Sequence, residues 1–236
     1  MDFRLNRRQV KNQDFSRPGT GNGLFVLLAV FFTLLAMPSL SQGYNLETVL
    51  YEAIQDEDKK QIDALLKQGI DINKGNYLNL VALEKNRNLF TYLLEAGADI
   101  NRSQEGPALS HEDPLDSGGK TPLCLIVSNF LSSKKAMETL HESDEWVEFL
   151  LANGADPNKK CYGKFTPLMM VSGKGADPEG LSQWDRLEMA MKIIVLLVKS
   201  GADLNASVEG LTAMDFANES RNLDLVMFLK SLGAAR

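Results

Sequence analysis

Four aspartates recur at matching places along the chain and offer the side chains best suited to acid–base chemistry. Asp71, Asp99, Asp156 and Asp203 each stand two residues after a glycine and two residues before an asparagine. An aspartate can act as a general acid or base. An active site is assembled once, however, whereas a structural role returns with every repeat of a structural unit. We therefore predict a structural role for these aspartates.

The histidines offer little more chemistry. His111 and His141 are the two histidines of the chain, and neither has a cysteine at a metal-ligand spacing. His111, Asp113 and Asp116 include metal-ligand types, but a polar solvated loop explains the same residues. The sequence therefore predicts no catalytic residue, no metal site and no cofactor. A hydrolase with a site near residues 102–119 is the alternative.

The glycine before each aspartate marks the predicted end of a helix. Chain reversal after a helix needs a left-handed residue, and glycine adopts that conformation without a Cβ clash. Four of the five glycines follow an apolar pair, as expected for the buried face of a helix. Thr121, Thr166 and Thr212 are predicted to cap the helices that come earlier in each unit. The five predicted stops are Gly69, Gly97, Gly154, Gly201 and Gly233.

The threonine start, the apolar pair and the Gly-Ala-Asp-Xaa-Asn stop resemble the ankyrin repeat when they recur in register. The resemblance covers roughly residues 46–236. It implies an all-α fold, an ankyrin-repeat solenoid of about five helix-turn-helix repeats with connecting β-hairpin loops. The family histidine after Thr-Pro-Leu is missing here, so its usual hydrogen bonds between repeats are not expected. Its place is taken by Tyr51, Asn79, Cys124, Met169 and Asp215.

Repeats three and four are predicted to have extended second helices. Both carry extra residues whose apolar side chains keep a helical spacing, with starts near Ser133 and Ser182. We expect matched residues such as Met137 and Trp184 to pack against each other. A third insertion, at 102–119, is rich in glycine and proline and is predicted to form a long loop.

The two cysteines are predicted to remain apart. By the ankyrin register, Cys124 lies early in a first helix and Cys161 lies in the next hairpin. We expect a separation too large for the Cα distance of about 5.5 Å that a disulfide prefers. The prediction is therefore one buried thiol and one hairpin residue, with a disulfide as the alternative in an exported protein.

Residues 1–41 are predicted to be a secretory signal peptide. Five basic residues precede an apolar run at 24–37. Even extended to Leu40, this run spans only about 25 Å as a helix, short of a hydrocarbon core of roughly 30 Å. We predict cleavage after Ser41 and export to the bacterial periplasm. The alternative is an uncleaved anchor in the inner membrane that holds the repeats outside the cytoplasm.

Removal of the predicted signal makes the chain more acidic. The 1–41 segment holds five basic and two acidic residues, so the formal net charge changes from −6 to −9. An acidic surface repels phosphate backbones, so nucleic acid is excluded as a partner. We predict a monomeric, non-catalytic protein-interaction module that binds through its hairpins, the 102–119 loop and a ledge formed by the extended second helices. Its predicted partner is an envelope enzyme or a toxin that the module neutralises. A membrane-anchored scaffold is the alternative.

The candidate binding residues come from the family resemblance. Ankyrin proteins commonly bind through hairpin tips and exposed first-helix positions, and apolar tips among charged residues suit a protein-binding patch. Packing between adjacent hairpins explains the same apolar tips equally well. The candidates are Lys120, Ser128, Asn129, Tyr162, Phe165, Lys174, Val208, Glu209, Leu211 and Glu219.

Overall fold

The computed structural model describes residues 46–103, 119–132, 136–162, 164–173 and 183–235, without the side chains of 129–142 and 183. The chain divides into two units, Met1–Tyr44 and Asn45–Arg236, and all described residues lie in the second. The predicted signal segment at 1–41 and most of the predicted loop at 102–119 therefore lie outside the described residues. None of the described helices is both long and apolar enough to cross a bilayer.

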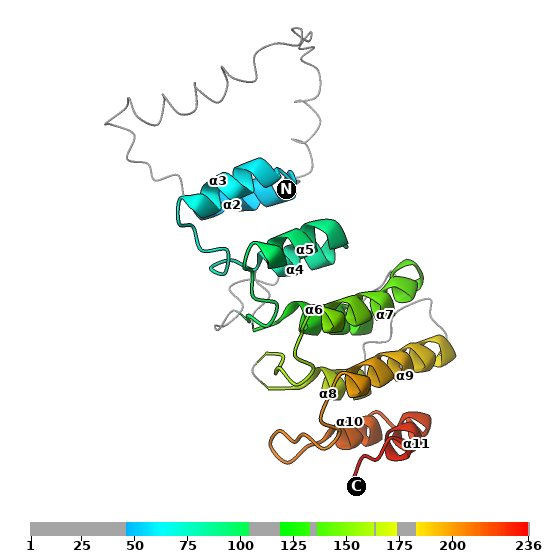
Figure 1. Cartoon of the computed structure of the whole chain (residues 1–236). Helices are drawn as coiled ribbons and strands as arrows, with labels where there is room; N and C mark the ends of the chain where they lie inside the picture. Colours follow the sequence, from blue (N-terminus) through cyan, green and yellow to red (C-terminus); the bar gives the residue numbers. More distant parts are fainter. Residues whose placement is uncertain (1–45, 104–118, 133–135, 163, 174–182, 236) are drawn as a thin grey trace, which may run out of the picture. The chain divides into compact units, whose positions relative to one another are not determined.

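The described residues form helices that pack in pairs, as the all-α prediction requires (Figure 1). Along the chain, the first helices of successive pairs contact one another from α4 through α6 and α8 to α10, and α7, α9 and α11 do the same. The pairs are α2 (Leu46–Gln55) with α3 (Lys59–Lys67), α4 (Tyr77–Leu83) with α5 (Arg87–Glu95), α6 (Pro122–Ser132) with α7 (Ala136–Ala152), α8 (Pro167–Ser172) with α9 (Gln183–Lys199), and α10 (Ala213–Glu219) with α11 (Leu223–Ser231).

The predicted helix starts and stops are confirmed. The hydroxyl oxygens of Thr121, Thr166 and Thr212 accept backbone N–H groups three residues later, at 3.2, 3.3 and 3.4 Å. All five predicted stop glycines have a left-handed backbone, with φ from 88° to 99°. Local capping chemistry therefore defines where these helices begin and end.

The hydrophobic core runs continuously along the helix pairs from Leu50 to Leu229. The first residue of each predicted apolar pair, for example Leu93 or Leu150, is fully or almost fully buried. An aromatic cluster of Phe90, Trp146 and Phe149 joins α5 to α7, with ring centroids 5.1 to 5.8 Å apart. Each pair therefore completes the core of its neighbour, which is how stacked helix pairs become stable.

The second helices α7 and α9 are longer than the others, as predicted. Each has 17 residues, whereas α3, α5 and α11 have nine. Leu187 is buried, but the expected burial of Trp184 is wrong, because this side chain is 72% exposed. Trp184 is the second residue of α9 and lies beyond the part of the helix that the core covers. Ser133, Ser182 and the side chain of Met137 lie outside the described residues.

The prediction that the cysteines stay apart is wrong. Cys124 and Cys161 form a disulfide with a Cα–Cα distance of 5.5 Å, and both residues are fully buried. The physical reason is the path of the loop before α8. The backbone N–H of Tyr162 donates to the carbonyl of Gly119 at 2.9 Å, which holds this loop against the residues that precede α6. Cys161 thereby lies over the first turn of α6.

Two residues at the place of the family histidine connect neighbouring helix pairs. The Asn79 amide nitrogen donates to the carbonyl of Lys120 at 3.0 Å, and Cys124 is joined covalently to Cys161. Asp215 instead turns back on its own helix and accepts the backbone N–H of Thr212 at 2.8 Å. These three positions therefore carry a hydrogen bond between pairs, a disulfide and a contact within one helix.

Candidate protein-binding surface

An asparagine in each loop reaches forward to the loop that follows. The Asn73 amide nitrogen donates to the carbonyl of Gly97 at 3.0 Å, and its oxygen accepts the backbone N–H of Asp99 at 2.7 Å. Asn101 and Asn158 make the same two hydrogen bonds to the next loops, at 2.7 to 2.9 Å. The oxygen of Asn205 accepts the backbone N–H of Ala235 at 2.8 Å. We call this series the asparagine ladder.

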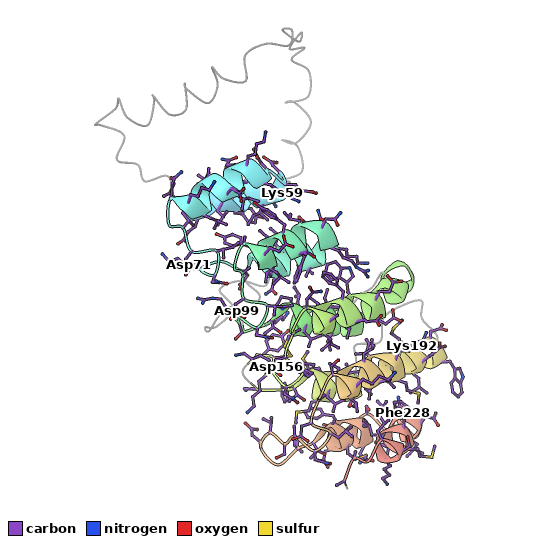
Figure 2. All side chains as sticks on the ribbon, in the orientation of Figure 1. Lys59, Asp71, Asp99, Asp156, Lys192 and Phe228 are labelled. Atoms are coloured by element: carbon purple, nitrogen blue, oxygen red, sulfur yellow. A yellow bond between two sulfur atoms is a disulfide. The ribbon has the colours of Figure 1, made fainter. Side chains whose placement is uncertain are left out.

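The recurring aspartates shape the same loops. Each carboxylate accepts the backbone N–H of the asparagine two residues later, at 2.8 Å in all four loops. This bond holds the asparagine in place for its step of the ladder. Figure 2 shows Asp71, Asp99 and Asp156 one after another along the loop side of the helix pairs. The predicted structural role of the aspartates is confirmed.

Replacing Asn158 by alanine is expected to lower the free energy of unfolding by about 1–2 kcal/mol, because two hydrogen bonds between loops are lost. Urea unfolding followed by circular dichroism measures the change. Asn218→Ala is the matched control, since Asn218 is exposed on α10 and outside the ladder. Equal stability of the Asn158 variant and the control contradicts a structural role for the ladder.

Two loops carry tight reversals at their tips. Val208 and Leu211 form an isolated antiparallel bridge with two 2.9 Å hydrogen bonds, and Cys161 and Phe165 form another. Between Val208 and Leu211, Glu209 and Gly210 both have positive φ, of 54° and 81°. Two consecutive left-handed residues are typical of the tightest hairpin turns. The backbone of the loop from Val208 to Leu211 therefore forms a tight hairpin turn.

The structure separates exposed candidates from packed ones. Tyr162 and Leu211 are 44% and 45% exposed at their loop tips, and Glu209 is exposed beside Leu211. The Lys120 ammonium lies 4.9 Å from the centroid of the Tyr162 ring, a cation–π geometry that orients the ring. We call Lys120, Tyr162, Glu209 and Leu211 the loop surface.

The remaining candidates do not join the loop surface. The Phe165 ring is half-buried and packs edge-on against Phe216, with centroids 5.4 Å apart, so loop packing explains this aromatic residue. Val208 is also half-buried, whereas Glu219 is exposed on α10. Ser128 is buried and its hydroxyl donates to the carbonyl of Leu125 at 2.9 Å, contrary to its expected exposure.

Two candidates lie outside the described residues, namely Lys174 and the side chain of Asn129. The same holds for His111 and for the side chain of His141. Among the side chains that are described, no three His, Cys, Asp or Glu residues are grouped so that they can hold a metal ion.

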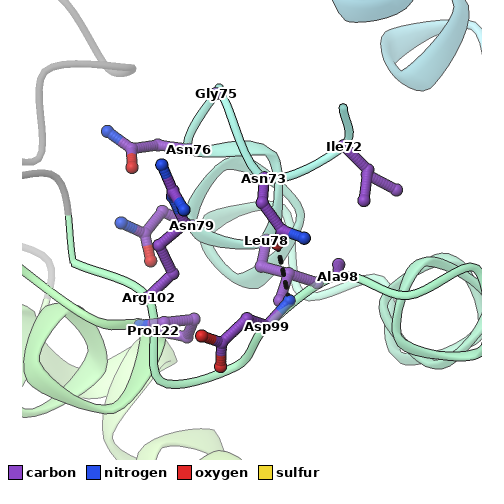
Figure 3. Close-up of a pocket in the computed structure, with 10 residues that line it drawn as sticks. All are labelled: Ile72, Asn73, Gly75, Asn76, Leu78, Asn79, Ala98, Asp99, Arg102 and Pro122. Carbon is purple, nitrogen blue, oxygen red and sulfur yellow. Dashed lines mark hydrogen bonds between the residues drawn. The ribbon is translucent and has the colours of Figure 1, made fainter. Parts of the chain in front are cut away.

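A small cavity lies where two loops meet (Figure 3). Its volume is about 20 Å³, and its lining includes Asn73, Asp99 and Pro122. The Asn73–Asp99 hydrogen bond of the ladder joins two of the residues that line this cavity. One water needs roughly 10–15 Å³, so this cavity is too small for an organic substrate.

The outer sides of the early second helices are occupied by internal contacts. The Tyr92 hydroxyl donates to the Asp63 carboxylate and lies 3.1 Å from the carbonyl of Lys59. Burial, the hydrogen bond to Asp63 and the negative charge of Asp63 together raise the pKa of Tyr92 to about 12. Further along, the Arg87 guanidinium lies 3.1 Å from the Glu145 carboxylate and over the Trp146 ring. These polar groups already have partners within the chain.

No protein-family model matches the chain. The chain is similar to a protein of Acanthamoeba polyphaga mimivirus whose name describes it as an ankyrin repeat protein. The two are 26% identical over 199 residues, which cover 80% of this chain. The chain spans 25% of the length of that relative, about a quarter. This similarity agrees with the resemblance of the sequence to the ankyrin repeat.

Proposed function

We propose that residues 46–236 are an ankyrin-repeat domain of about five repeats that binds another protein and carries out no catalysis. The proposal is supported by the paired helices, by the loop pattern that the asparagine ladder connects, and by the similarity to the mimivirus protein. Stacks of such pairs offer extended surfaces that suit protein partners.

The observation that carries the proposal is the loop surface. Tyr162 and Leu211 are large apolar side chains that stay about half exposed on two successive loops, with Lys120 and Glu209 as charged neighbours. Aromatic and apolar anchors within a charged rim are typical of the energetic centre of an interface. The asparagine ladder holds the two loops together through Asn158, so the anchors are ordered before a partner arrives.

The proposed partner is an envelope enzyme or a toxin, and the proposed location is the periplasm. Both depend on the basic and apolar residues at 1–41, which lie outside the described residues. A scaffold that keeps this segment as a membrane anchor presents the same loop surface and is the second candidate. The other alternative, a hydrolase with its site near 102–119, depends on a segment that lies mostly outside the described residues.

Combining Tyr162→Ala with Leu211→Ala is expected to weaken partner binding by at least 100-fold, because truncating one interface anchor typically costs about 2 kcal/mol or more. Affinity capture from an envelope extract identifies the partner, and titration with the purified partner measures the affinity of each variant.

Trp184→Ala is the matched control, since Trp184 is an exposed aromatic residue away from the loops. The control is expected to bind like the unaltered chain. Full binding by the double variant contradicts the loop surface as the binding site.

A further inference from the structure

A second surface lies on the second helices, away from the loops. A hollow of about 450 Å³ runs across α9 between α7 and α11, and we call it the outer groove. Figure 2 shows Lys192 and Phe228 on this helical side, whereas the labelled ladder aspartates lie on the loop side. The groove is lined by Asp144, Glu145 and Glu148 of α7, by Glu188, Met191, Lys192, Val195 and Leu196 of α9, and by Phe228 of α11.

Positions counted back from the stop glycines show how the polarity of this helical side changes from one pair to the next. The residue six positions before each glycine is polar in the first three pairs and apolar in the last two. In chain order these residues are Asp63, Thr91, Glu148, Val195 and Met227. The residue ten positions before each glycine changes in the same way. In chain order these residues are Lys59, Arg87, Asp144, Met191 and Leu223.

The last residue of each of these two series is apolar and exposed to solvent. Leu223 is 72% exposed and Met227 is 61% exposed on α11, at the register positions of Met191 and Val195 in the groove. Single exposed apolar residues are common, but an apolar area that continues across two helices marks an interaction site. The early helices differ, because their side chains at these positions include Lys59 and Arg87, which cover aromatic rings of their own chain.

The lining of the groove is also acidic. Its lining holds four carboxylates and one ammonium group, a formal net charge of −3. Lys192 lies 2.9 Å from Glu188, and Arg87 lies 3.1 Å from Glu145. Glu148 is exposed, and Asp144 is half-buried beside it on α7. The acidic side is therefore α7, and the apolar side is α9 with α11.

We propose that the outer groove binds a basic amphipathic segment of another protein. Its apolar side chains cover Met191 and Val195 in the groove and extend to Met227, which follows them in register on α11 outside the groove lining. Its lysine or arginine side chains lie against Asp144 and Glu148. Opposite charges of this kind guide association and fix orientation, while apolar burial supplies affinity. This site uses no residue of the loop surface, so the chain has two separate docking sites.

Two matched peptides test the proposal against the full chain. Each has 18 residues and the same leucines at helical spacing, and the other positions are lysine in one peptide and glutamate in its counterpart. Fluorescence anisotropy is expected to show that the lysine peptide binds at least tenfold more tightly. Equal affinity for both peptides overturns the proposal, because it reports unselective apolar adhesion.

Variants locate the binding of the lysine peptide. Val195→Ser with Met227→Ser removes apolar contact without changing the charge and is expected to weaken binding at least tenfold, and Glu148→Lys at least threefold. Glu52→Lys on α2 is the charge-matched control and Leu46→Ser is the apolar control, since both positions are exposed and far from the groove in the chain. Equal weakening by the controls overturns the assignment to the groove.

Two further measurements separate this proposal from its alternatives. The loop-surface variant, Tyr162→Ala with Leu211→Ala, is expected to bind the lysine peptide normally, so the two docking sites succeed or fail independently. Sedimentation of the unaltered chain is expected to show no self-association through the groove. A dimer that Met227→Glu dissociates overturns the proposal in favour of a second copy of this chain.

Discussion

Replacing Cys124 and Cys161 together by alanine is expected to lower the free energy of unfolding by about 3–4 kcal/mol. The disulfide joins residues 37 positions apart, so it removes many conformations from the unfolded chain. Alanine is chosen rather than serine, because both cysteines are fully buried and a serine hydroxyl there would have no water to bind. Urea unfolding of the oxidised chain and of the double variant measures the difference.

Reduction of the unaltered chain provides the control for this prediction. Dithiothreitol is expected to lower its urea midpoint toward that of the double variant and to leave the double variant unchanged. A double variant as stable as the oxidised chain contradicts a stabilising disulfide. Intact-mass analysis after thiol alkylation shows directly whether the two sulfurs are bonded before reduction.

Phe90→Ala is expected to lower the free energy of unfolding by about 3–5 kcal/mol, because it leaves a cavity in a packed core. Phe90 is fully buried on α5, and its ring contacts Trp146 and Phe149 of α7 edge-on, with centroids 5.8 and 5.6 Å away. The substitution therefore weakens the contact between the second and third helix pairs. Trp146 is 3% exposed, so its fluorescence reports this unfolding in urea.

Met227→Ala is the control for Phe90→Ala, since Met227 is 61% exposed and its loss is expected to change stability by less than about 0.5 kcal/mol. A loss below about 1 kcal/mol for Phe90→Ala contradicts the role of the aromatic cluster. Because Trp184 is 72% exposed and also fluoresces, Trp184→Phe serves as the background for both variants.

The features that local chemistry determines were predictable from the sequence. A threonine cap, a left-handed glycine and an apolar pair each act within a few residues, so Thr166, Gly154 and Leu150 have the roles predicted for them. The structural role of the aspartates followed from their repetition for the same reason.

The features that depend on neighbouring pairs were not predictable in the same way. The distance from Cys124 to Cys161 depends on how the loop before α8 folds back on Gly119. Ser128 occupies a position that the register marks as exposed, yet α6 lies between α4 and α8 and this residue is buried. The prediction for Trp184 failed in the opposite direction, since this residue was expected to be buried and is exposed. Helical spacing alone does not reveal where the core ends.

The outer groove corresponds to a pattern in the sequence, which lies on the second helices and not in the loops. Asp63, Glu148, Val195 and Met227 stand at one register position relative to the stop glycines, and only their comparison shows the change from polar to apolar. The candidate site was therefore predicted in part. Tyr162 and Leu211 were proposed from the family resemblance and are exposed in the structure. The extended second helices were also predicted to take part in binding, but the residues of the groove were not singled out.

The disulfide also limits how far unfolding from the two ends of the domain can spread. Stability in a linear array is shared between nearest neighbours, so thermal fraying starts at the terminal helix pairs and moves inward. A covalent clamp from α6 to the loop before α8 stops that fraying in the middle of the array. Tyr162 directly follows Cys161 in the chain. This proposed interface residue therefore stays in place while the terminal helix pairs unfold transiently.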